Sequence, residues 1–157
     1  MIVEFKLIEP EHVTRSPFLQ SERSRAIHDL EENNHFSLLK FPEVQLKVTL
    51  SIDHERLYFQ FKSAATDEEL PAIALSPRPY RKFIQDYFLM VESYEHIRAE
   101  GTLHKLEAVD MARRAIHNEA AELLTERLAD KIAMDFETAR RLFTLICVLH
   151  LGQGKQL

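Results

Sequence analysis

The sequence contains little cysteine, glycine or tryptophan: one cysteine, three glycines and no tryptophan among 157 residues. A single cysteine, Cys147, excludes an intramolecular disulfide, which fits a reducing compartment. Three glycines are too few for a glycine-rich phosphate loop, and neither a nucleophile elbow nor a zinc-finger spacing occurs. The sequence therefore argues against nucleotide binding through a glycine loop and against these two kinds of site.

Long apolar runs and positive charge are also scarce. The longest nearly apolar run, residues 142–151, has ten residues, whereas a membrane-spanning helix needs about twenty. Residues 1–8 alternate and carry an early acid, unlike a signal peptide. The net charge is -5, so no global field attracts nucleic acid or anionic lipid. We expect a cytoplasmic protein without a membrane or nucleic-acid partner.

Alternating apolar and polar residues predict strands in the first half of the chain. The alternation covers residues 2–8, 44–52 and 57–61, and residues 70–75 are a further strand candidate. A short helix is expected near residues 21–33, with Ser21 as its N-cap. Residues 1–75 are thus predicted to be mainly β and to form an antiparallel sheet of about four strands.

Residues 76–152 follow a helical period. Ser76 and Pro77 favour a helix start, Gly101 favours the end of that helix, and the next should run over 103–131. Asp135 can cap a last helix ending at Gly152. We predict one α+β domain over residues 1–157, with three long C-terminal helices packed on one face of the sheet.

The last helix is apolar around nearly its whole circumference over residues 136–151. Such a helix is buried either at the centre of its own domain or against a partner. The sequence leaves both readings open, the second being a homo-oligomer or a protein partner bound through this helix.

Several motifs are similar to those of a known family: Asp110–Glu119, Thr138–His150, Asp86–Phe88, Glu92–Tyr94 and the segment from Glu22 to Leu30. Together they resemble uncharacterised protein family 0262, a bacterial family, over nearly the whole chain. Positions 112, 115 and 120 are alanine where the family has glycine, which favours helix more strongly. The resemblance supports one cytoplasmic domain and implies no activity, because the family has none assigned.

One broad face of the 103–131 helix carries charged and imidazole side chains: His104, Glu107, Asp110, Arg114 and His117. Carboxylates and imidazoles at helical spacing can bind a divalent metal. However, Arg114 lies in the middle of this face and would repel a cation, and Asp110 can pair with it along the helix. We predict ion pairs here, with no metal and no cofactor.

Arg113 points toward the apolar side of the same helix, where its charge needs a partner. One hypothesis is a structural ion-pair network, formed by Glu92, Asp110, Arg113, Arg127 and Asp135. The other is a pocket for phosphate or carboxylate, formed by Arg113, Arg114, Asn118, Arg140 and Arg141.

His117 and Glu119 are the only catalytic candidates that the sequence offers, His117 as a general base. Glu119 lies two residues further along the helix and points elsewhere, so it cannot orient the imidazole. Cys147 lies among apolar residues, as a buried and inert thiol would. Two functions remain open: a non-enzymatic binding or self-associating module, and a small-molecule enzyme or ligand binder with an Arg/His/Glu anion pocket on the 103–131 helix.

Overall fold

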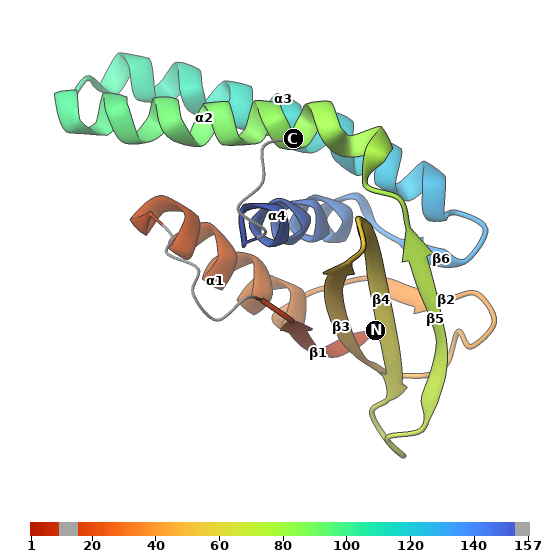
Figure 1. Ribbon diagram of the computed structural model, residues 1–157. Helices are drawn as coiled ribbons and strands as arrows, with labels where there is room; N and C mark the ends of the chain where they lie inside the picture. The colour runs from red at the N-terminus through yellow and green to blue at the C-terminus, as the bar shows by residue number, and fades with distance from the viewer. Residues whose placement is uncertain (10–15, 153–157) are drawn as a thin grey trace.

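The computed structural model describes residues 1–9 and 16–152 (Figure 1). In chain order the elements are β1 (Ile2–Leu7), α1 (Pro17–Glu32), β2 (Phe36–Leu38), β3 (Leu46–Asp53), β4 (Arg56–Ser63), β5 (Glu69–Leu75), the short 3-10 helix η1 (Arg78–Tyr80), α2 (Arg81–Glu100), α3 (Leu103–Leu128), β6 (Ile132–Met134) and α4 (Phe136–Gly152). The predicted α+β class is confirmed. In the described part of the chain, no helix is both long and apolar enough to cross a membrane.

The main sheet has the strand order β1-β3-β4-β5. The predicted β3–β4 hairpin is present, with Leu46 opposite Ser63 and Asp53 opposite Arg56. The prediction of a wholly antiparallel sheet is wrong, because β1 pairs with β3 in parallel. Parallel neighbours need a long crossover, and α1 belongs to the connection between these two strands. A second, two-stranded sheet joins β2 to β6, and β6 lies inside the region 76–152 that was predicted to be helical.

Capping residues mark three of the helix boundaries, whereas α2 begins at Arg81, after η1, and not at the predicted Pro77, and no described side chain caps its N-terminus. The first helix begins four residues before the predicted cap, since the Ser16 hydroxyl accepts from the backbone N–H of Leu19 at 3.2 Å. Gly101 ends α2 with a φ of 72°, as predicted. Asp135 caps α4 by accepting from the N–H of Thr138 at 3.0 Å.

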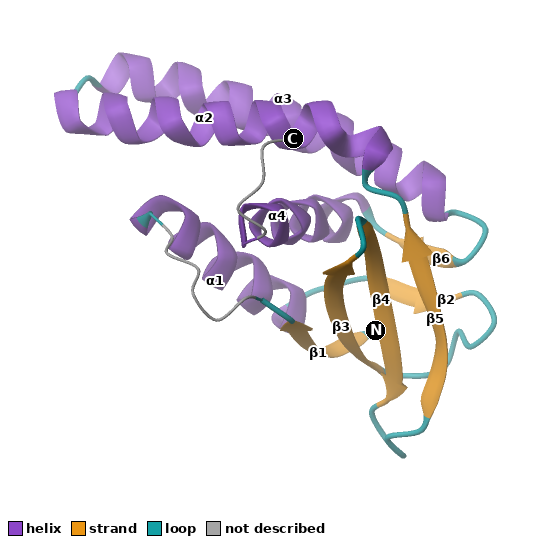
Figure 2. Cartoon of the chain, in the orientation of Figure 1, coloured by secondary structure: helices purple, strands orange, loops and turns teal. Residues whose placement is uncertain are grey.

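The core is centred on α4. Figures 1 and 2 show α4 lying between the sheet and the hairpin of α2 and α3, with α1 beside it. Every residue of α4 from 138 to 150 is buried except Arg140 and Arg141, which are half-buried. The chain's own helices and β3 pack against α4, so of the two readings of this apolar helix the central one holds. The side chains from 138 to 150 leave no exposed apolar face for a second copy.

Candidate functional site

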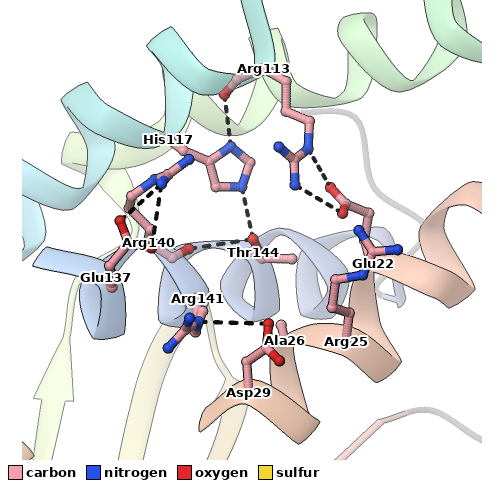
Figure 3. Close-up of a pocket in the computed structure, with 10 residues that line it drawn as sticks. All are labelled: Glu22, Arg25, Ala26, Asp29, Arg113, His117, Glu137, Arg140, Arg141 and Thr144. Carbon is pink, nitrogen blue, oxygen red and sulfur yellow. Dashed lines mark hydrogen bonds and ion pairs between the residues drawn. The ribbon is translucent and has the colours of Figure 1, made fainter. Parts of the chain in front are cut away.

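A cavity of about 140 Å³ lies where α1, α3 and α4 meet (Figure 3). Four arginines, three carboxylates and one buried histidine line it. In full, the lining residues are Glu22, Arg25, Ala26, Asp29, Arg113, His117, Glu137, Arg140, Arg141 and Thr144. The lining therefore carries one excess positive charge in a chain whose net charge is -5.

Glu22 forms the back of this cavity because α1 buries it. The buried face of α1 carries Leu19, Glu22, Ala26 and Leu30, so a carboxylate occupies one position of an otherwise apolar stripe. Its two oxygens accept from Arg113, at 3.0 Å from Nε and 3.2 Å from Nη2, and the Tyr87 hydroxyl donates to it at 3.1 Å. A carboxylate with only 7% of its side chain exposed thus has a forked, charge-assisted partner.

Burial and electrostatic interactions with Glu22 set the charge states of Arg113 and Tyr87. Burial alone would lower the pKa of Arg113, but the hydrogen bond and the charge of Glu22 outweigh it, and the pKa is raised. Burial, and then the negative charge of Glu22, raise the pKa of the Tyr87 phenol well above its usual value. Arg113 therefore remains a cation paired with Glu22, and Tyr87 remains a neutral donor.

His117 lines the cavity but is almost fully enclosed. Its Nδ1 lies 2.8 Å from the carbonyl oxygen of Arg113, its Nε2 lies 2.7 Å from Oγ1 of Thr144, and it is 3% exposed. Because a carbonyl only accepts, Nδ1 carries the proton, and in the neutral ring Nε2 accepts from the Thr144 hydroxyl. The rings of Tyr87 and Phe143 pack edge-on against the imidazole. Burial lowers the pKa of His117 to about 4, so the ring is neutral near pH 7.

Three further arginines line the cavity: Arg25, Arg140 and Arg141. Arg140 donates from Nη1 to Glu137 at 3.1 Å, while its Nε is buried without a hydrogen-bond partner in the described residues. Arg141 donates to the carbonyl oxygen of Asn33 at 2.9 Å, and its Nε lies 3.9 Å from Asp29. Arg25 is exposed and makes no hydrogen bond or ion pair within the described residues.

Several residues singled out from the sequence lie elsewhere. Arg114 is exposed and pairs with Asp110 at 3.0 Å, and Asn118 and Glu119 are exposed and do not line the cavity. Arg114 and Asn118 are thus separated from Arg113, Arg140 and Arg141, which do converge. Cys147 is fully buried, and burial raises its pKa well above the usual value.

The ion-pair network expected around Arg113 has a different membership. Asp110 contributes, since it lies 3.8 Å from Arg113, but the main partner is Glu22 on α1. Glu92 and Arg127 are exposed, and Asp135 bonds instead with His35 at 3.0 Å and with Thr138. Among the described residues, no group of three His, Cys, Asp or Glu side chains is placed to hold a metal ion.

Sequence reasoning missed six residues of this cavity: Glu22, Arg25, Ala26, Asp29, Glu137 and Thr144. A signal existed for Glu22, because it falls at helical spacing with the apolar residues Leu19 and Ala26. No comparable signal marks Arg25, which lies on an exposed part of α1.

The structure defines the class of protein: an α+β domain in which the central helix and two neighbouring helices line an arginine-rich cavity. The chain belongs to the Uncharacterised protein family (UPF0262), which it matches over residues 1–152. This agrees with the resemblance seen in its motifs.

Bacterial relatives share much of the sequence. A UPF0262 protein of Hyphomonas neptunium is 47% identical over 139 residues, 88% of this chain and 85% of the relative. One from Acidiphilium cryptum is 44% identical over 135 residues, covering 86% and 83%. One from Rhodospirillum rubrum is 43% identical over 149 residues, covering 95% and 91%. No solved structure gives a significant match.

Proposed function

We propose that this protein is a non-enzymatic binder of a small phosphate-bearing molecule, and that the phosphate enters the cavity between α1, α3 and α4. The observation that carries the proposal is the convergence of four guanidinium groups from three helices on one cavity. Guanidinium groups match the planar, multi-oxygen geometry of phosphate and carboxylate. Arg25, Arg140 and Arg141 approach from two helices, which suits the three terminal oxygens of a phosphate better than the two of a carboxylate.

The arginines of the cavity keep N–H donors that their protein partners do not use and that a ligand can accept from. Arg113 uses Nε and Nη2 on Glu22, so we assign it to the wall of the site. Arg140 and Arg141 each retain guanidinium donors beyond their bonds to Glu137 and Asn33, and Arg25 is free of partners in the described part of the chain.

The surroundings of His117 favour binding over catalysis. A general base must reach a substrate proton and have a pKa near the working pH. Both ring nitrogens of His117 are already bonded, and its pKa is lowered to about 4 by burial.

The buried thiol of the single cysteine, Cys147, suits a reducing cytoplasm, which we take as the location.

Isothermal titration calorimetry with inorganic phosphate tests the proposal on the wild type, Arg25→Gln and Arg140→Gln. Each substitution should weaken binding about tenfold or more, because a hydrogen bond to a charged group contributes roughly 1.5–3 kcal/mol. Arg127→Gln is the matched control, since it removes one exposed arginine outside the cavity. Absence of phosphate binding, or equal losses in all three variants, would contradict the proposal.

A further inference from the structure

A second cavity, of about 240 Å³, adjoins the arginine-lined one. The two cavities share Glu22, Arg25 and Arg113. The rest of the second lining comes from α1, α2 and α3, namely Phe18, Ser21, Met90, Tyr94, Val109 and Asp110. The two cavities therefore meet at the Glu22–Arg113 ion pair.

The cavities follow one another along α1 and α3. On α1, Phe18 lines the second cavity, Glu22 lines both, and Ala26 lines the first, each one helical turn further along. On α3, Val109 lines the second, Arg113 both, and His117 the first. The same order on both helices describes one groove that the ion pair divides.

The two halves of this groove differ in chemistry. Arg140 and Arg141 line only the first cavity, together with the shared Arg25 and Arg113. The second has a mixed lining with an apolar part formed by Phe18, Met90, Tyr94 and Val109, and the rings of Phe18 and Tyr94 lie 4.2 Å apart between centroids. The second cavity is lined by two carboxylates, Glu22 and Asp110, and by the two shared arginines, so its lining has no excess charge, whereas that of the first has one excess positive charge. Charge therefore directs an anionic group toward the first cavity and an apolar group toward the second.

We infer that the ligand is an organic phosphate ester with a flat or compact apolar group, which spans both cavities. The inference rests on the proposed phosphate site. Ordinary ligand pockets measure about 300–1,000 Å³; neither of these two cavities reaches that range alone, and together they do. The phosphate lies among Arg25, Arg140 and Arg141, and the organic group packs against Phe18, Met90 and Tyr94.

Titration calorimetry of inorganic phosphate and phenyl phosphate, with phenol as the uncharged probe, tests this inference. The wild type should bind phenyl phosphate at least tenfold more tightly than phosphate, and phenol only weakly. Ser21→Trp should abolish the preference for phenyl phosphate and keep phosphate binding, because Ser21 is exposed and a large side chain there fills the second cavity without removing core packing. Phe18→Ala should reduce the preference for phenyl phosphate, because it removes a ring that the organic group contacts. Leu103→Ala, an exposed apolar change outside both cavities, serves as the control.

Equal affinity for phosphate and phenyl phosphate would overturn the inference and leave the phosphate site intact. A preference that survives both Ser21→Trp and Phe18→Ala would also overturn it, because the organic group would then lie outside the second cavity. Failure of phosphate and phenyl phosphate alike to bind the wild type would instead refute the phosphate site on which the inference rests.

Discussion

At the scale of single residues, the pair of Glu22 and Arg113 joins α1 to α3 across 91 positions of sequence. Glu22 is nearly buried, whereas Arg113 keeps 24% of its side-chain surface exposed. Removing one partner of a buried pair leaves the other charge without compensation, which costs more than the pair itself contributes. The pair therefore fixes the position of α1 at the wall of both cavities.

Glu22→Gln should lower the free energy of unfolding by about 3 kcal/mol, at the low end of the range for buried pairs because Arg113 is partly solvated. Urea denaturation measures the loss, and the exposed Glu92→Gln serves as the control. The double variant Glu22→Gln, Arg113→Met should recover much of it, since no uncompensated charge remains. A single-variant loss as small as that of Glu92→Gln would show that the pair has no structural role.

His117 predicts a dependence of stability on pH. Its pKa is about 4 in the folded chain and 6.5 in the unfolded one, so between these values only the unfolded chain gains the proton. Stability should be unaffected by this group above pH 6.5 and fall as the pH drops toward 4, by up to about 3 kcal/mol. His150, whose pKa burial also lowers, acts in the same direction. Urea denaturation of the wild type and His117→Asn should give a flatter pH profile for the variant; superimposable profiles would refute this account of His117.

At the scale of elements, the central position of α4 explains how a small chain can bury a helix that is apolar on nearly all sides. Leu145 is fully buried, and its neighbours on every side belong to the same chain. Leu145→Ala should therefore cost about 2–5 kcal/mol of unfolding free energy. Leu103→Ala, on a helix residue that is 70% exposed, should change it by less than about 0.5 kcal/mol. Similar values for the two variants, measured by denaturant unfolding, would contradict the central position of α4.

Local sequence patterns predicted some elements of the fold and not others. The β3–β4 hairpin, the Gly101 stop and the Asp135 cap depend on residues close together in sequence, and all three are confirmed. The direction of β1 depends on how α1 returns the chain to the sheet, and alternation alone does not encode it. The β2–β6 ladder joins strands of three residues each, which are too short to show a period.

At the scale of the whole molecule, the fold class could be predicted, but only part of the candidate site could. Arg113, Arg140 and Arg141 do line one cavity, as the anion-pocket hypothesis expected, and their binding of a ligand remains a prediction. Glu22 and Arg25 come from α1, and only tertiary packing brings them to α3 and α4. The inward direction of Arg113 was visible in the helical period, whereas the identity of its partner was not.

The central claim is that phosphate binds among Arg25, Arg140 and Arg141, and NMR of the arginine Nε–Hε groups tests it most directly. On titration with inorganic phosphate, the signals of these three residues should shift together with one dissociation constant. Arg114 and Arg127, which lie outside the cavity, should not shift. Shifts spread evenly over all the arginines, or none at all, would contradict the claim.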